Sequence, residues 1–184
     1  MKFNRLAVAG LMVLAVASVF LLSGCTDEST RAVLTVVDLN TGNTYYSDLI
    51  NEADSAKTFI PVDEIKFTLG NIQNDGGGPL APGTPFSEIV VTGYNVTYSP
   101  AIYSPVTGGL ALRIPSGGTV EGTIAISDLA EKAGLPLSTA TTTIATITFS
   151  GYNRINGSNN GDGVSGFGKL TVQVANFGDT NVNQ

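Results

Sequence analysis

Short runs in which apolar and polar residues alternate recur along this chain, and clusters of glycine, proline and asparagine separate them. In the clearest run, Ile65, Phe67 and Leu69 alternate with Lys66 and Thr68. Because successive side chains of a β-strand point to opposite faces, this spacing predicts strands with one buried face and one wet face. Helices place apolar residues three and four positions apart, so the pattern favours an all-β chain.

The same reasoning predicts about seven strands, with one further stretch, 43–50, that is ambiguous between strand and turn. The predicted strands cover 33–37, 65–69, 88–98, 110–114, 120–126, 141–149 and 170–174. In the longest of them we expect one face to hold Val90, Thr92, Tyr94, Val96 and Tyr98. Gly93 in the middle of that strand suggests a β-bulge.

Three local patterns add detail to this prediction. The turn sequence of residues 115–118, Pro-Ser-Gly-Gly, predicts a hairpin that pairs 110–114 with 120–126. Asp128 and Gly134 fit the N-cap and the stop of a helix of one or two turns. The run Thr141–Phe149 is apolar on both faces near its centre, which favours a central strand.

Strands at this spacing, with one short helix, predict an antiparallel sandwich of two sheets. An immunoglobulin-like or fibronectin-III-like topology is the first expectation, and a jelly roll or a small open barrel is the alternative. No internal repeat is evident, so we expect a single β-sandwich domain over 32–178, followed by a polar tail over 179–184.

The composition argues against several classes of function. The chain has no histidine, which removes Ser-His-Asp and Cys-His catalysis and most zinc sites. It has no tryptophan, the residue typical of aromatic sugar-binding platforms. All fifteen acidic residues follow position 24, against seven basic ones, so this part has a formal charge of −8. Such a charge argues against nucleic acid as a partner and against electrostatic docking on anionic lipid.

The first 25 residues form a separate segment. Lys2 and Arg5 give it a basic start, an apolar run of 17 residues extends from Leu6 to Leu22, and Ser23 and Gly24 lead into Cys25, the only cysteine. This order resembles the signal peptide of a bacterial lipoprotein, and Leu22-Ser23-Gly24-Cys25 matches the lipobox of that family. The run is also at the lower edge of what spans a bilayer, so a retained transmembrane helix is the alternative.

The resemblance implies that residues 1–24 are removed and that Cys25 carries diacylglycerol and palmitate. Residues 25–31 would then be a lipidated tether. Because Thr26 and not aspartate follows the cysteine, the resemblance favours the outer membrane, on its periplasmic or surface face, over retention in the inner membrane. The following domain looks like the small immunoglobulin-like lipoproteins of bacterial envelopes.

Two motifs near the C-terminus share one glycine-rich loop. Gly161, Gly163 and Gly166 fit the G-x-G-x-x-G string of dinucleotide folds, but they lie between two predicted strands, which indicates a hairpin tip. Oxygen-bearing side chains fill 156–162, and Asp162, with Asn160 and Asn156, is a weak set of calcium ligands. Asn-Gly-Ser clusters are also ordinary turn chemistry, which is the interpretation we favour.

Acidic residues form three close pairs that a glycosidase could use: Glu52 with Asp54, Asp63 with Glu64, and Asp128 with Glu131. We interpret them instead as solubilising surface and helix capping, because neighbours in a strand point to opposite faces. The sequence therefore predicts a non-enzymatic, lipid-anchored envelope protein that binds an envelope protein or a polysaccharide, with no cofactor besides the lipid on Cys25. A calcium-dependent sugar-binding or adhesive module and a carboxylate hydrolase are the alternatives.

Overall fold

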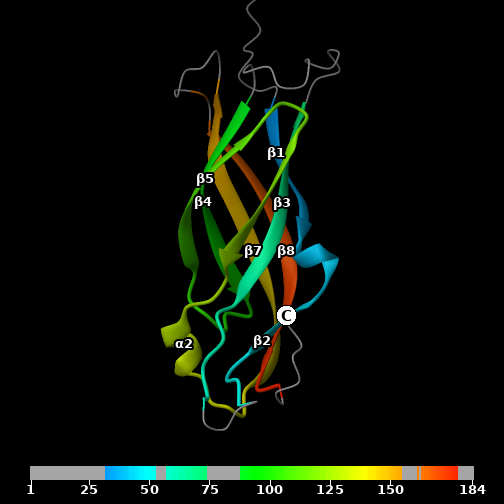
Figure 1. Cartoon of the computed structure of the whole chain (residues 1–184). Helices are drawn as coiled ribbons and strands as arrows, with labels where there is room; N and C mark the ends of the chain where they lie inside the picture. Colours follow the sequence, from blue (N-terminus) through cyan, green and yellow to red (C-terminus); the bar gives the residue numbers. More distant parts are fainter. Residues whose placement is uncertain (1–31, 53–56, 74–87, 155–160, 162, 178–184) are drawn as a thin grey trace, which may run out of the picture.

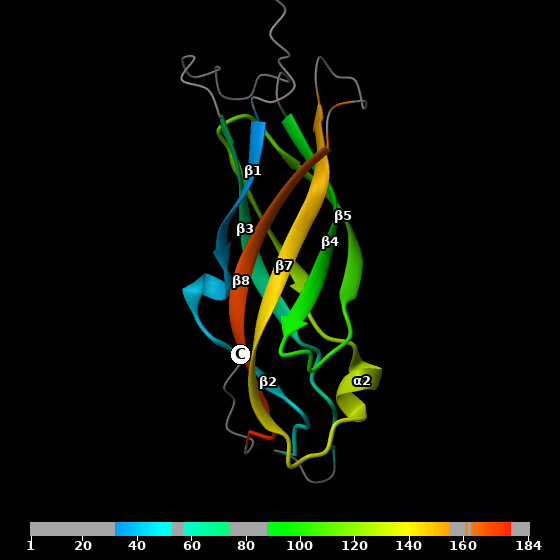
Figure 2. The ribbon, with the colours of Figure 1, turned by 180° about the vertical axis from the view of Figure 1, so that it is seen from behind.

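The structure is a computed structural model that describes residues 32–52, 57–73, 88–154, 161 and 163–177. Two β-sheets pack face to face around one hydrophobic core (Figures 1 and 2). The smaller sheet has the order β1-β3-β6, with β1 at Ala32–Leu39, β3 at Glu64–Gln73 and β6 at Thr119–Ala125. The larger sheet has the order β2-β8-β7-β4-β5, with β2 at Tyr45–Asp48, β8 at Gly163–Ala175, β7 at Ala140–Arg154, β4 at Glu88–Ser99 and β5 at Val106–Ile114.

Within the described residues, two short helices join these strands: the 3-10 helix η2 at Asn40–Gly42 and the α-helix α2 at Leu129–Ala133. The predicted all-β, two-sheet sandwich is therefore confirmed, with eight described strands where about seven were expected. The strand order agrees with immunoglobulin domains, in which A, B and E are neighbours in one sheet and G, F, C and C′ in the other. Here β1, β3 and β6 correspond to the first set, and β8, β7, β4 and β5 to the second.

One pairing departs from the expected antiparallel arrangement, because β2 runs parallel to β8. At η2 the chain leaves the edge of the smaller sheet and joins the edge of the larger one without reversing its direction. Asn40, Thr41 and Gly42 take φ angles of 50°, 53° and 73° at this point, and the Asp38 carboxylate accepts a 2.9 Å hydrogen bond from the backbone N–H of Thr41. The strand β2 therefore continues in the direction of β1.

In β3 and β8, period-two alternation correctly predicted which side chains are buried. Ile65, Phe67 and Leu69 of β3 are at most 1% exposed. The alternating residues of 170–174 in β8 are likewise buried, and β7 lies in the middle of its sheet as predicted. The ambiguous stretch 43–50 contains the short strand β2, whose Tyr45 and Ser47 point into the core.

The predicted bulge in β4 is present, but its consequence for the strand's faces was missed. The register of β4 with both neighbours shifts between Val91 and Gly93. The extra residue reverses the inward and outward alternation, so Ile89 and Val91 are buried before the bulge and Val96 and Tyr98 after it. The expectation that Val90, Thr92, Tyr94, Val96 and Tyr98 share one face is therefore wrong.

The predicted hairpin of 110–114 with 120–126 is also wrong, because β5 pairs with β4 whereas β6 pairs with β3. The turn over 115–118 instead carries the chain from one sheet to the other. Asn71 near the end of β3 fixes this crossing: its backbone donates to Gly118 O, accepts from Gly117 N, and its side-chain amide donates to Ile114 O. The sequence correctly predicted a turn at residues 115–118, but it did not predict which strands pair on either side of the turn.

The sandwich has two distinct ends. Ala32 pairs with Gln73, and Glu88 pairs with Arg154, so the start of β1 lies at the end where these three other strand ends meet (Figure 1). We call this the Ala32 end. The opposite end, which we call the α2 tip, comprises residues 57–63, the connection 100–105, and α2 with the residues up to 139 (Figures 1 and 2).

Candidate functional site

A buried ion pair connects α2 to the start of β3 at the α2 tip. The Lys132 ammonium lies 2.7 Å from Asp63 Oδ1, and these side chains are 0% and 2% exposed. The same Lys132 nitrogen donates a 2.8 Å hydrogen bond to the carbonyl of Pro61. A charged group that is buried away from water needs hydrogen-bond partners for all of its polar atoms. The second carboxylate oxygen of Asp63 therefore needs donors of its own.

Two serines satisfy the other carboxylate oxygen of Asp63. Ser47 on β2 and Ser127 after β6 each donate to Oδ2 at 2.6 Å. The Tyr103 hydroxyl lies 3.1 Å from Ser47 Oγ. Since the single Ser47 proton is given to Asp63, Tyr103 is the donor in that contact. We call Ser47, Asp63, Tyr103, Ser127 and Lys132 the ionic cluster. It joins both sheets, α2 and the 100–105 connection.

Local structure puts these groups in place. The Asp63 carbonyl accepts from Ile126 N at 2.9 Å, which extends the β3–β6 ladder and places Ser127 beside the carboxylate. Asp128 caps α2 by accepting a 2.6 Å hydrogen bond from Ala130 N, and Gly134 follows its last residue, so this predicted helix is confirmed. The cap begins the single turn that aims Lys132 inward.

Burial keeps the tyrosines of this region neutral. It raises the pKa of Tyr103 to about 12, and it raises the pKa of Tyr45 and Tyr98 still further, with the charge of Asp63 as the second cause for those two. Tyr98 donates its hydroxyl proton to the carbonyl of Ile126, and its ring meets that of Tyr103 edge to face at 5.4 Å. The cluster therefore has neutral hydroxyl donors around one ion pair.

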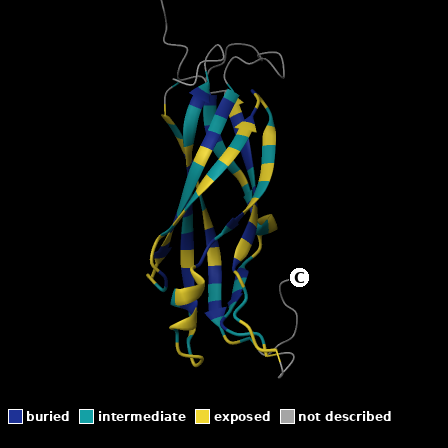
Figure 3. Cartoon of the chain, turned by 60° about the vertical axis from the view of Figure 1, so that its left-hand side comes forward, coloured by how far each residue is buried: buried dark blue, intermediate teal, exposed yellow. Residues whose placement is uncertain are grey.

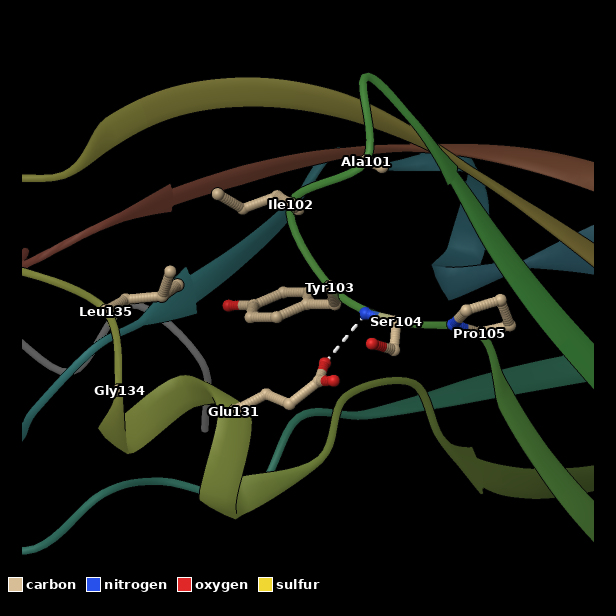
Figure 4. Close-up of a pocket in the computed structure, with 8 residues that line it drawn as sticks. All are labelled: Ala101, Ile102, Tyr103, Ser104, Pro105, Glu131, Gly134 and Leu135. Carbon is tan, nitrogen blue, oxygen red and sulfur yellow. Dashed lines mark hydrogen bonds between the residues drawn. The ribbon is translucent and has the colours of Figure 1, made fainter.

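A surface pocket of about 510 Å³ lies beside the ionic cluster (Figure 4). Ile102, Tyr103 and Leu135 give it an apolar wall, and Glu131 from α2 stands at its side. The Glu131 carboxylate accepts a 2.7 Å hydrogen bond from Ser104 N, the dashed line in Figure 4, which holds the 100–105 connection against the helix. The pocket can hold an apolar group and place a cation near a carboxylate.

Large apolar side chains are also exposed at the α2 tip. Eight such side chains lie on the surface of the described residues, and four of them belong to the α2 tip: Phe59, Val62, Leu129 and Leu137, each 44–57% exposed. Figure 3 shows exposed residues on α2 and on the loops beside it. The hydrogen bond from Lys132 to Pro61 places the segment of Phe59 and Val62 against the helix that carries Leu129. Gathered exposed apolar residues mark interaction surfaces more often than scattered ones do.

The structure gives the members of one predicted acidic pair different environments. Asp63 is buried in the cluster, whereas its neighbour Glu64 is exposed on the opposite face of the strand, so the surface interpretation of Asp63 is wrong. Asp128 caps the helix, as predicted, whereas Glu131 accepts a hydrogen bond from the backbone of Ser104, which was not predicted. Glu52 is described but Asp54 is not. Among the described residues, no group of three or more His, Cys, Asp or Glu could hold a metal.

Several predicted sites lie outside the described residues. These are the signal segment 1–24 with Leu22, Ser23 and Gly24, the lipidation residue Cys25, the tether up to 31, the tail 179–184, and the three calcium candidates Asn156, Asn160 and Asp162. Of the dinucleotide-like string, Gly163 and Gly166 belong to β8, which pairs with β7, and this strand context fits the hairpin interpretation. No described helix is long and apolar enough to span a membrane.

The ionic cluster itself was not foreseen. Its acid and its base are 69 positions apart, and Ser47 and Ser127 are among many hydroxyl residues. One signal was present: Asp63 directly precedes the alternating run of β3 and shares the phase of Ile65 and Phe67, which predicts an inward side chain. An inward carboxylate requires a partner, and the short helix holds one of the few lysines. Comparisons with family models, curated proteins and solved structures found no significant match to this chain.

Proposed function

We propose that this chain is a lipid-anchored, non-enzymatic protein of the bacterial cell envelope that binds a partner protein with its α2 tip. The observation that carries the proposal is the gathering of exposed apolar side chains and the pocket at one end of the sandwich. That end is opposite to Ala32, where the chain enters the domain from the lipobox segment.

An anchor at Cys25 would orient the domain with its α2 tip away from the membrane. The six residues 26–31 would separate the acylated cysteine from Ala32, so the Ala32 end would face the membrane. Since β7 has 15 residues at about 3.3 Å each, the tip would stand roughly 50 Å further out. We place the anchor in the outer membrane, because threonine and not aspartate follows Cys25. A short tether and a long, stiff domain together suit presentation of the tip to another protein.

The ionic cluster supports binding by holding the tip in one shape. Lys132 ties the helix to residues 61–63, and Tyr103 ties the 100–105 connection to β2 through Ser47. A surface that is already ordered loses less conformational freedom when a partner binds. We therefore expect the ionic cluster to increase the affinity for the partner by fixing the positions of α2 and the 100–105 connection. We do not expect it to contact the partner directly.

The chemistry of the tip indicates what the partner presents. Leu129 and Leu137 offer apolar contacts, and the carboxylates of Asp128 and Glu131 lie beside them. Both carboxylates already accept a backbone hydrogen bond, but each keeps its negative charge and further acceptor sites. A complementary surface combines apolar side chains with lysine or arginine.

The test is chemical crosslinking in intact cells, followed by identification of what is joined to the full chain. The double variant Leu129→Ser, Leu137→Ser should lose a specific partner that the parent captures. Val37→Ser is the matched control, because Val37 is 60% exposed on β1, away from the tip, and it should retain the partner. Loss of the partner from both variants, or from neither, would contradict binding at the tip.

The anchor is tested separately by metabolic labelling with palmitate. The parent chain should incorporate the label and Cys25→Ala should not. Label that persists in Cys25→Ala would refute the lipidation site, while the crosslinking result could still stand.

A further inference from the structure

The outer face of the five-stranded sheet differs from the rest of the surface in its chemistry. Its outward positions on β7, β8 and the end of β4 are rich in hydroxyl groups, among them Thr97, Thr146, Thr148 and Thr171. In the middle of this hydroxyl face stands Phe167 on β8, opposite Thr148 of β7. Phe167 is 67% exposed, more than any other large apolar side chain that the structure describes.

The position of Phe167 follows from packing on the inner side of β8. A Cβ at Gly166 would lie 2.5 Å from the carbonyl oxygen of Leu34, and one at Gly168 would lie 2.7 Å from Leu39. The strand β1 therefore fills the space under both glycines, and no side chain can point inward there. The Phe167 ring must therefore lie on the outer face, because a shift of one residue in the register of β8 would place the ring where β1 lies.

The hydroxyl face also lacks carboxylates. Between Gly93 and Ser99 of β4, Ala140 and Ser150 of β7, and Gly163 and Ala175 of β8 there is no aspartate or glutamate, and Lys169 is the single charge. The outer face of the smaller sheet, by contrast, exposes Glu64 and Glu121. In a chain whose residues after position 24 carry a formal charge of −8, two copies can approach on the hydroxyl face without opposing carboxylates.

We propose that two copies of this chain pair through their hydroxyl faces, with a two-fold axis running along β7. This axis places Thr146 and Thr148 against their own counterparts. It places Phe167 against β4 of the second copy and Lys169 against a threonine hydroxyl, so the two lysines do not meet. An axis parallel to the strands keeps both Ala32 ends on the same side, and face-to-face sheets pack with nearly aligned strands.

The size of the face predicts a weak contact. Three strands about 4.8 Å apart and nine residues long cover roughly 430 Å² per copy. A standard interface takes about 800 Å² per partner, so pairing in dilute solution is expected to be partial. Anchoring in a shared membrane would raise the effective concentration and favour the pair, and only this enhancement rests on the proposed anchor.

Disulfide trapping in vesicles tests the pair with the full lipidated chain. Thr148→Cys puts a thiol on the axis, and Thr123→Cys puts one on the exposed face of β6 as the matched control. Under mild oxidant, Thr148→Cys should give at least five times more covalent dimer than Thr123→Cys, with the parent chain as baseline. Equal yields from the two variants would overturn the proposal.

Two further readouts separate this contact from nonspecific association. Adding Phe167→Ser to Thr148→Cys should reduce trapping about tenfold, whereas adding Val37→Ser on the opposite sheet should leave it unchanged. Raising the salt from about 0.02 to about 0.5 M should increase trapping, because salt screens the repulsion between acidic copies and the face holds no ion pair to weaken. Trapping that falls with salt, or that ignores Phe167→Ser, would contradict the assignment.

Discussion

The two ends of the sandwich each contain an ion pair, and the pairs differ in almost every physical respect. At the α2 tip, Lys132 and Asp63 are 2.7 Å apart and fully buried. At the Ala32 end, Arg154 and Glu88 are 3.4 Å apart, with side chains 24% and 18% exposed. The first pair joins elements that no β-ladder connects, whereas the second joins two residues that already pair across β4 and β7.

The difference indicates that the contribution of an ion pair to stability depends on which elements it connects and on how far it is buried. A partly wet pair between neighbouring strands gains little over the hydrogen bonds already present. A buried pair repays its desolvation only when other groups complete its hydrogen bonds, as Ser47 and Ser127 do here. We therefore expect the ionic cluster to govern the stability and shape of the tip, and the Arg154–Glu88 pair to have little effect.

The largest expected effect is that of Lys132→Met. The change fills a similar volume but leaves the Asp63 carboxylate buried without its counter-ion, so the free energy of unfolding should fall by about 3–5 kcal/mol. Chemical denaturation, followed by circular dichroism, measures this loss. A loss below about 1 kcal/mol would mean that the two ion pairs are energetically alike.

Ser127→Ala should have the next largest effect. It removes one of the two hydroxyl donors to Asp63 Oδ2 while the ion pair stays intact. Hydrogen bonds to charged groups contribute about 1.5–3 kcal/mol, so the unfolding free energy should drop by that amount in the same assay. Ser150→Ala on the exposed outer face is the control and should change it by less than about 0.5 kcal/mol.

The tip should also make the protein sensitive to alkali. The pKa of Tyr103 is about 12 in the folded protein against 10 for an ordinary tyrosine, so above pH 10 the unfolded chain loses this proton first. Its contribution to stability is complete below pH 10 and is lost as the pH rises towards 12, at up to about 1.4 kcal/mol per pH unit. Denaturation at several pH values should show a smaller slope for Tyr103→Phe than for the parent chain.

Arg154→Met should have the smallest effect. The guanidinium is a quarter exposed and its contact with Glu88 is long, so the unfolding free energy should change by less than about 1 kcal/mol. Added salt should reduce even this difference, since water reaches the pair. A loss as large as that of Lys132→Met would contradict the distinction between the two ends.

Local patterns predicted the parts of the fold that depend on near neighbours. The alternation of Ile65, Phe67 and Leu69 fixed a buried face, and Asp128 and Gly134 fixed a one-turn helix. Local patterns did not predict which strands pair with one another. The Pro-Ser-Gly-Gly turn looks like a hairpin turn, but Asn71 holds it where the chain crosses between sheets.

The ionic cluster shows the same limit within the site. The sequence predicts Asp63 at the surface, because carboxylates are seldom buried, whereas its partners come from two distant segments, β2 and residues 127–132. The bulge at Gly93 was predicted, yet the faces of β4 on its two sides depend on how β5 and β7 pair with it. In both cases the missing information concerns residues distant in sequence.

The sequence by itself determined the all-β class, the buried phase of β3 and β8, and the short capped helix, because these depend on side-chain spacing over a few residues. The match of Leu22-Ser23-Gly24-Cys25 to a lipobox remains a prediction. Only the tertiary structure decided that Lys132 would find Asp63, that Phe167 would stand outside above two glycines, and that the tip would lie opposite Ala32. Those outcomes depend on which strands are neighbours, and strand pairing is set by the packing of the whole core and not by local preference.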